Sequence, residues 1–259
     1  MGVSFQVMSF NIRHYWADDG ENSWERRSRA LVRILKDNRA DVICFQEVNY
    51  PIFGFLSKAL PGYEIASDLK EQGPRWEYRP IYVKQPTRIL EQETLSLSET
   101  PKKPSKSWGS NFIRQVTRVL LELDGTVLAV YNTHLDFEEN VQLNQARVIW
   151  NTVQAKDKDR PVVLCGDFNS TPDKKAFGLL TGRSADLSEM TGDFKNSMPH
   201  KKINTFHGFM KGLKVGYIDW VLYRGPGLGL VRPARTIKDK PQGRFPSDHY
   251  PVIAEFELA

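Results

Sequence analysis

Runs of apolar residues that stop on polar side chains recur along this chain, and the clearest of them is Val162 to Cys165. Four apolar residues in a row predict a strand that is buried on both faces. Asp167 and Asn169 follow, and because alternate side chains of an extended chain point the same way, both would face one site. Thr171 and Pro172 then predict an N-cap and the first position of a helix. The alternative for this segment is a solvated turn that happens to contain Asp and Asn.

The same pattern of apolar and polar positions predicts many strands and few helices in the rest of the chain. Strands are expected at residues 5–12, 41–47, 79–84, 90–97, 117–123, 127–133, 217–223 and 251–258. Helices are expected from an N-cap at Asn22 to about Asn38, at residues 52–60, and around Ala146, Ile149, Trp150 and Val153. Asp124 and Gly125 predict the turn of a hairpin. Residues 98–114 are expected to form an exposed loop, and residues 195–214 carry no clear pattern.

Length and composition favour a single domain. A chain of 259 residues can form one large α/β domain, and no linker, repeat or low-complexity tract divides it, so we expect one domain over residues 1–259. Cys44 and Cys165 each lie in an apolar run, which favours buried reduced thiols over a disulfide. There is no leader pattern and no run that approaches a membrane span. We therefore expect a cytoplasmic protein without membrane contact, and we take it to be a monomer.

The charge is mildly basic. A net charge of +5 and a pI near 9.1 are compatible with a partner that bears phosphate. The basic residues are spread in small groups, such as residues 26–29, 102–103 and 200–202, which are typical of solvated surfaces. Charge alone is therefore weak support for nucleic-acid binding.

Polar residues stand at the ends of the predicted strands, and their types suit metal-dependent chemistry. These residues are Asn11, Glu47, His134, Asp167, Asn169, Asp248 and His249. Their repeated placement at strand ends indicates one concave site. Carboxylate and amide oxygens without a Cys ligand suit a hard cation such as Mg²⁺ or Mn²⁺, and the His and Asp side chains are candidates for proton transfer.

Short motifs in order from residue 9 to residue 249 resemble the endonuclease/exonuclease/phosphatase superfamily, which comprises metal-dependent phosphoesterases with a deoxyribonuclease-I-like fold. The motifs are Ser9 to Arg13, Phe45 to Val48, Asn132 to Leu135, Gly166 to Ser170, Tyr217 to Asp219 and Ser247 to His249. The resemblance implies an α/β (α+β) fold, a four-layer αββα sandwich of two mostly antiparallel sheets flanked by helices.

On the metal side, the resemblance implies that Glu47 is the main ligand of Mg²⁺ or Mn²⁺, with Asn11 and Asp248 near the ion. Asp219 would position His249, which members of the superfamily are argued to use either as a base or as a phosphate stabiliser. Taken without the resemblance, Asn11 could be a turn former and Asp219 a partner for an Arg.

On the phosphate side, the resemblance implies that Asp167 orients or deprotonates the attacking water. Asn169 would contact the scissile phosphate, and His134 would donate to a phosphate oxygen. His134 could otherwise cap a strand end. These roles match the needs of phosphodiester hydrolysis, which are charge neutralisation, an aligned water and help for the leaving oxygen.

Further residues bear on the branch of the superfamily. Glu77 is placed like the Glu that deoxyribonuclease I pairs with the equivalent of His134. Residues 97–101, with Trp108 and Arg114, resemble an uncharacterised bacterial-type branch of hydrolases. Arg114 could clamp a phosphate or be a surface Arg. The sequence departs from apurinic-site endonucleases, and it lacks clear signs of the added elements of sphingomyelinases, inositol-phosphate phosphatases and deadenylases.

We therefore expect a Mg²⁺-dependent phosphodiesterase that acts on nucleic acid, with DNA as the favoured partner, which would make it a DNase of the endo- or exonuclease kind. The candidate substrate contacts are Asn169, His134, Glu77, Arg13, Arg114 and Trp108. Exposed aromatic side chains can stack bases at ~1–3 kcal/mol each. An enzyme that cleaves a small phosphoester of a sugar, inositol or lipid head group in a narrow pocket is the alternative. A non-catalytic binding module is the third hypothesis, and the complete set of motifs argues against it.

Overall fold

The described part of the chain folds into two six-stranded sheets with helices outside them. The computed structural model describes residues 2–67, 73, 75–183, 191–199, 203–210, 213 and 215–259. The strands are β1 (Val3–Asn11), β2 (Val42–Gln46), β3 (Tyr63–Ala66), β4 (Ile81–Lys84), β5 (Arg88–Ser96), β6 (Gln115–Leu123), β7 (Thr126–His134), β8 (Val162–Asp167), β9 (Lys195–Asn196), β10 (Asp219–Arg224), β11 (Leu228–Thr236) and β12 (Val252–Leu258). The helices are α1 (Trp24–Asp37), α2 (Tyr50–Ala59), α3 (Glu139–Asp157) and α4 (Lys175–Thr181), with 3-10 turns η1 (Gly20–Asn22) and η3 (Pro241–Gly243).

The strand order brings four strand ends together. One sheet has the order β11-β12-β1-β2-β4-β3 and the other β5-β6-β7-β8-β10-β9. The neighbours β1 and β2 are parallel, as are β7 and β8, whereas the other pairs are antiparallel. Parallel neighbours end at the same edge of their sheet. Asn11 on β1 hydrogen-bonds Asp167 on β8, and Gln46 on β2 hydrogen-bonds Asn132 on β7, so the two pairs end side by side.

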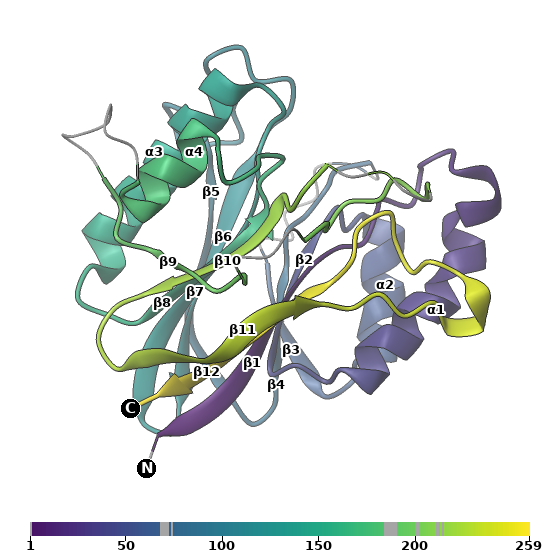
Figure 1. Cartoon of the computed structure of the whole chain (residues 1–259), viewed down its shortest axis with the longest axis horizontal. Coiled ribbons are helices and arrows are strands. Elements are labelled where there is room, and N and C mark those ends of the chain that lie inside the picture. Colours follow the sequence, from purple (N-terminus) through teal and green to yellow (C-terminus); the bar gives the residue numbers. More distant parts are fainter. Residues whose placement is uncertain are drawn as a thin grey trace.

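The layers follow from alternation along the strands. On β8, Val163 and Cys165 pack between the two sheets, whereas Val162 and Leu164 pack outward against α3 and α4. Figure 1 shows α3 and α4 on the outside of one sheet and α1 and α2 on the outside of the other. This four-layer αββα arrangement confirms the predicted fold class. Cys44 and Cys165 are buried and free, as predicted, and both lie in the core between the sheets.

Two helix starts differ from the sequence prediction. Asn22 belongs to the turn η1, and Ser23 is the residue that precedes α1, with its carbonyl accepting the first helical N–H groups. Thr171 and Pro172 do not begin α4. Thr171 instead hydrogen-bonds Asp173 and accepts the backbone N–H of Lys174 in a turn, so the helix starts only at Lys175.

The strands β3, β9 and β11 were not predicted. β3 and β9 are short, and the apolar start of β11 is interrupted by Gly229 and followed by polar residues. β11 is a sheet edge with mostly exposed residues, a Pro and two register shifts against β12, which is typical of an edge strand. The prediction that residues 98–114 form an exposed loop was also wrong in part. Ser98, Ser110 and Arg114 within this loop are buried. Within the unpatterned stretch at 195–214, the basic group at 200–202 lies outside the described residues.

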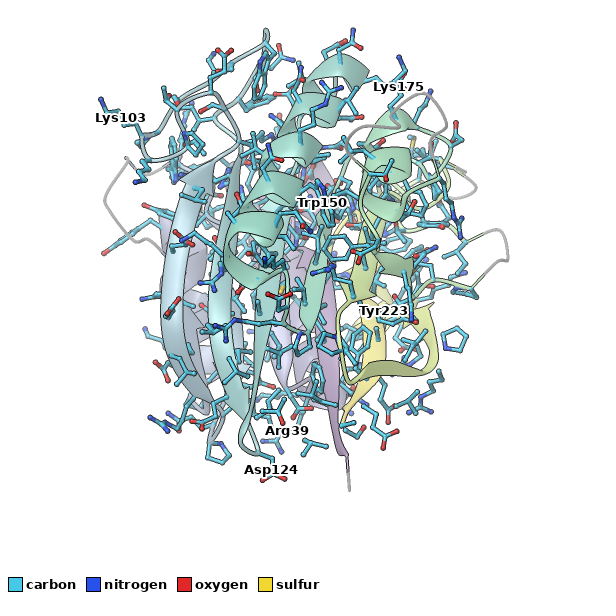
Figure 2. All side chains as sticks on the ribbon, turned by 90° about the vertical axis from the view of Figure 1, so that its left-hand side faces the viewer. Arg39, Lys103, Asp124, Trp150, Lys175 and Tyr223 are labelled. Atoms are coloured by element: carbon cyan, nitrogen blue, oxygen red, sulfur yellow. The ribbon has the colours of Figure 1, made fainter. Side chains whose placement is uncertain are left out.

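The functional end of the molecule can be located from β7. This strand leaves the hairpin turn at Asp124 and ends at His134. Figure 2 shows Asp124 at one end of the molecule, with Lys103 and Lys175 at the other, so His134 lies toward the Lys103 and Lys175 end. Among the described residues, no helix has the length and apolar character needed to cross a membrane.

Candidate active site

Residues from both sheets meet at this end of the molecule. They are Asn11 at the end of β1, Glu47 after β2, His134 at the end of β7, Asp167 at the end of β8, Asp219 at the start of β10, and Asp248 and His249 before β12. Gly166 is required for the β8 end to lie close to β7, since a Cβ atom there would come within 2.1 Å of the Thr133 carbonyl oxygen. All these site residues except Glu47 have whole-residue exposures below one tenth.

Asp167 is the centre of the site. Its Oδ2 atom accepts a hydrogen bond from Asn11 Nδ2 at 2.9 Å and lies 3.5 Å from His134 Nε2 and 3.6 Å from His249 Nε2. Burial, with the nearby charge of Asp219, raises the pKa of Asp167 to about 7, although the charge of His249 opposes this. A carboxyl group of this kind can hold a water molecule and take its proton near neutral pH.

Asp219 holds His249 from the other side. The Nδ1 atom of His249 lies 2.9 Å from Asp219 Oδ2 and 3.2 Å from Oδ1, which leaves Nε2 directed toward Asp167. Burial lowers the pKa of His249, but the charges of Asp219 and Asp167 outweigh it and raise this pKa well above its usual value. Thr205, which sequence reasoning missed, fixes Asp219 by accepting the backbone N–H groups of Ile218 and Asp219.

Glu47 forms the core of a candidate cation site. Its Oε1 accepts Asn11 Nδ2 at 2.9 Å, its Oε2 accepts the backbone N–H of His14 at 3.0 Å, and its backbone is left-handed with φ of 62°. Burial raises the pKa of Glu47, but the Asn11 hydrogen bond and the charge of His14 lower it by more, so the pKa ends below its usual value. His14, Glu47 and Glu77 bring ligand atoms within 4.8 Å of one another, and their oxygen-rich donor set fits a divalent cation.

Asn11 and Asp248 flank this site in different ways. The Asn11 amide nitrogen bridges Glu47 and Asp167, and its Oδ1 accepts the backbone N–H of Arg13. In this arrangement Asn11 therefore aligns two carboxylates. Asp248 lies 3.8 Å from Arg13 Nε, and burial, followed by the charge of Glu47, raises its pKa despite the opposing charge of His249.

Arg27 is a buried residue of the site that the sequence did not reveal. Its guanidinium donates to the carbonyl oxygens of Ile12, Arg13 and Pro246, and thereby ties the end of β1 to the segment that carries Asp248. Burial lowers the pKa of Arg27 to about 10, so the side chain stays charged at neutral pH. Three carbonyl contacts from distant segments leave no pattern in a sequence, apart from an Arg on the apolar side of a helix.

Asn169 reaches the site by a route other than the predicted extended strand. Its φ is 48°, a left-handed conformation that Asn tolerates, and its backbone N–H donates to Asp167 Oδ1 at 2.9 Å. Its side-chain Nδ2 donates to the Leu135 carbonyl at 2.9 Å. The turn keeps Asn169 beside Asp167, but simple alternation along β8 does not explain its position.

The predicted substrate contacts have mixed placements. Arg13 pairs with Asp19 through two hydrogen bonds of 3.0 Å. Arg114 is buried, which excludes a surface Arg, and its Nη1 lies 3.6 Å from Glu77 Oε2. Glu77 therefore pairs with Arg114 and lies near Glu47. It does not pair with His134, as the comparison with deoxyribonuclease I had implied.

Trp108 and His134 complete the predicted set. Trp108 is half-buried with a left-handed backbone, and no polar contact joins it to the described site residues. Burial and the charges of Arg114 and Arg79 lower the pKa of His134 well below its usual value, so this imidazole is neutral. Its Nδ1 is buried and has no hydrogen-bond partner among the described residues.

The chain matches the endonuclease/exonuclease/phosphatase family over residues 8–249, and it therefore belongs to that family. An endonuclease/exonuclease/phosphatase structure from Bacteroides vulgatus is 24% identical, with a TM-score of 0.87 over 99% of this chain and 100% of the other. A mannosyl-6-phosphatase from Bacteroides thetaiotaomicron is 22% identical, with a TM-score of 0.82 over 97% of this chain and 99% of the other. These two likenesses show the fold.

The curated relatives are longer proteins. The CCR4-Not complex 3′-5′-exoribonuclease subunit Ccr4 of Yarrowia lipolytica is 25% identical over 98% of this chain and 48% of its own length. The chain spans about half the length of such relatives. The likeness therefore concerns one part of those proteins.

Proposed function

We propose that this chain is a divalent-metal-dependent phosphoesterase. The observation that carries the proposal is the arrangement around Asp167, a buried carboxyl group with a pKa of about 7 that faces two imidazoles and shares Asn11 with Glu47. Asp167 can act as a base, protonated His249 as a cation and Glu47 as a carboxylate for a metal ion, all around one reacting centre. Membership in the endonuclease/exonuclease/phosphatase family supports the same chemistry.

Each residue then has a role in hydrolysis. Asp167 orients the attacking water and takes its proton, while protonated His249, held by Asp219, stabilises the phosphoryl oxygens. Neutral His134 donates one hydrogen bond to a phosphate oxygen. Glu47 would hold Mg²⁺ or Mn²⁺ together with Glu77 and His14. Asp248 lies close enough to Glu47 for the two carboxylates to repel each other. When bound, such an ion neutralises charge that develops on the phosphate.

A nucleic-acid phosphodiester is the first candidate substrate, with DNA as the specific case. Ccr4 is named as an exoribonuclease, so a relative of this chain acts on nucleic acid. The net charge of +5 suits a polyanion. Trp16 is 46% exposed on the loop that follows Asn11, where an aromatic ring could stack on a base.

A small phosphoester is the second candidate, because the two arginines expected to hold DNA are not displayed as free cations. Arg13 is paired with Asp19, and Arg114 is buried beside Glu77. A mannosyl-6-phosphatase shares the fold. A site of this kind would clamp one phosphate and would not follow a strand.

A substrate panel tests the proposal. Wild-type protein is assayed with Mg²⁺ or Mn²⁺ on plasmid, single-stranded DNA, RNA and small phosphoesters, with EDTA and an Asp167→Asn variant as controls. We expect hydrolysis of at least one class, with loss of activity in both controls. Full activity in EDTA would refute metal dependence, and no hydrolysis of any class would refute the phosphoesterase.

A further inference from the structure

Two loops beside the site are held together by one buried carboxylate. Asp136 accepts the backbone N–H groups of Phe112 at 3.2 Å and Phe137 at 2.8 Å, and it also binds the Ser110 hydroxyl at 2.7 Å. Gln142 donates to the carbonyl oxygens of Phe137 and Asn169, which fastens the Phe137 loop to the Asp167 turn. The backbones of both phenylalanines are therefore fixed before any ligand arrives.

The two rings are nevertheless left open to solvent. Phe112 is 48% exposed and Phe137 is 59% exposed, and their centroids lie 6.1 Å apart with planes inclined at 76°. Exposed apolar side chains that lie next to one another often mark a surface that binds a ligand or a partner. A rigid aromatic pair binds a flat ring at a low cost in conformational entropy.

A cation lies beneath the pair. The guanidinium carbon of Arg114 is 4.7 Å from the Phe112 centroid and 5.7 Å from the Phe137 centroid. The Arg114 side chain is only 3% exposed, its Nη1 lies 3.6 Å from Glu77 Oε2, and its Nε has no hydrogen-bond partner within the described chain. Buried polar groups are nearly always hydrogen-bonded, so the unpaired Nε–H of Arg114 points to an oxygen atom of a ligand.

The pair also lies at the correct place for a group attached to the reacting phosphate. Phe137 follows His134 by three residues, and Arg114 contacts Glu77, whose carboxylate lies within 4.8 Å of a Glu47 oxygen. The Arg114 guanidinium thus lies between the cation site, which it meets at Glu77, and the two aromatic rings, and one of these rings is three residues from the phosphate-side His134. A nucleotide has the matching order of phosphate, sugar and base.

We propose that Phe112 and Phe137 form a base-stacking subsite. Arg114 would hydrogen-bond an oxygen atom of the sugar–phosphate unit that carries the base. This inference rests on the proposed nucleic-acid phosphoesterase, and it adds Phe112 and Phe137, which no sequence motif identified, to the predicted contact Arg114. A nucleobase suits this subsite because the two apolar rings offer π-faces on which a base can stack.

The test is the binding of adenosine 5′-monophosphate and ribose 5-phosphate to the Asp167→Asn variant with Mg²⁺, measured by calorimetry. These probes differ only in the base. We expect Phe112→Ala and Phe137→Ala each to weaken adenosine 5′-monophosphate binding about tenfold and to leave ribose 5-phosphate unchanged. Phe137→Trp should retain the affinity, Phe137→Leu should lose it, and Val231→Ala, which removes an exposed apolar side chain on β11, should have no effect.

Three outcomes overturn the subsite. The first is that Asp167→Asn binds both probes with equal affinity, and the second is that the Phe variants lose affinity equally for both. The third is that the Phe variants lose as much affinity for mannose 6-phosphate, which would assign the rings to a sugar. Wild-type hydrolysis in the substrate panel separates these failures from that of the proposed function. The phosphoesterase stands if hydrolysis occurs while the Phe variants bind normally, and it falls if nothing is hydrolysed.

Discussion

Glu47 shows how much one side chain of the site depends on its neighbours. Asn11 and the His14 backbone hydrogen-bond both of its oxygens, and these contacts help to keep it ionised despite burial. The motif around Glu47 could be found from sequence, because a carboxylate directly after an apolar run is a visible pattern. The left-handed backbone that turns it into the site could not, since it depends on contacts with β1.

A Glu47→Gln variant should need a higher concentration of Mg²⁺ for half-maximal activity, because a neutral amide binds a divalent cation more weakly than a carboxylate. The measurement is a titration of activity with Mg²⁺. Glu257→Gln, an exposed residue on β12, is the matched control. A Glu47→Gln curve that overlays that of the wild type would show that Glu47 is not a ligand.

Asp219→Asn should lower kcat about 10²-fold and leave KM nearly unchanged, because the variant no longer holds His249 as a cation facing Asp167. The comparison is with Asp193→Asn, which removes a carboxylate from an exposed pair with Arg224. A variant with the kcat of the wild type would show that the Asp219–His249 pair is dispensable.

Other residues of the site act through loops and could not be predicted. Thr205 holds the backbone of Asp219, Asp136 joins two loops, and Arg27 binds three carbonyl groups. Each role joins segments far apart in the chain through backbone atoms. Backbone atoms are the same in every sequence, so such partners carry no signal in the residue types.

At the scale of elements, a buried ion pair fastens α3 to its sheet. Asp157 at the end of α3 accepts Arg118 Nε and Nη2 at 2.7 Å each and the Tyr131 hydroxyl at 2.5 Å. Burial raises the pKa of Asp157, but the hydrogen bonds from Arg118 and Tyr131 outweigh it, so the net pKa is lowered. The apolar face of α3 was predictable, whereas this anchor was not.

Asp157→Asn should lower the free energy of unfolding by about 3 kcal/mol at pH 7, because it removes the buried carboxylate that pairs with Arg118 Nε and Nη2 and leaves this charge with the more exposed Glu91 and Glu93. The folded-state pKa of Asp157 is lowered, so its contribution to stability is present above the unfolded pKa of about 3.9 and is lost as the pH falls through the folded-state pKa. Urea unfolding at pH 7 and below pH 4 measures this. Asp37→Asn, an exposed i,i+4 pair with Arg33, should cost less than about 0.5 kcal/mol.

A difference between Asp157→Asn and wild type that stays constant down to pH 3 would contradict this account. More generally, buried strands such as β8 were predictable because they contain an unbroken apolar run. The edge strands β3, β9 and β11 and the start of α4 were not, because local turns around Thr171 and edge pairing override weak sequence signals. The loop at 98–114 was misjudged because its buried Arg114 is stabilised by Phe112 and Phe137.

For the whole molecule, the motif order led to the correct fold because the family resemblance spans almost the full chain. Substrate class is harder, since charge counts do not show which arginines are paired. The net charge of +5 suggested a DNA surface, yet Arg13 is held by Asp19 and Arg114 is buried. The surface charge near the site is therefore lower than the composition suggests.

Salt dependence separates the two candidate substrates. For a DNA oligonucleotide bound to Asp167→Asn, each phosphate contact should lower the affinity by ~0.7–0.9 log units per log unit of salt. If Arg13 is such a contact, adding Arg13→Ala should reduce the slope by that amount, and Arg244→Ala serves as a control on an exposed Arg. A slope near zero would favour the small phosphoester over DNA.

The central claim is that Asp167 sits at the reacting phosphate of a metal-dependent phosphoesterase. The most direct measurement is the turnover of wild type and Asp167→Ala on the best substrate of the panel with Mg²⁺, with thermal unfolding recorded for both. We predict at least a ~100-fold fall in turnover with a cooperative unfolding transition retained. Turnover of Asp167→Ala equal to that of the wild type would contradict the account.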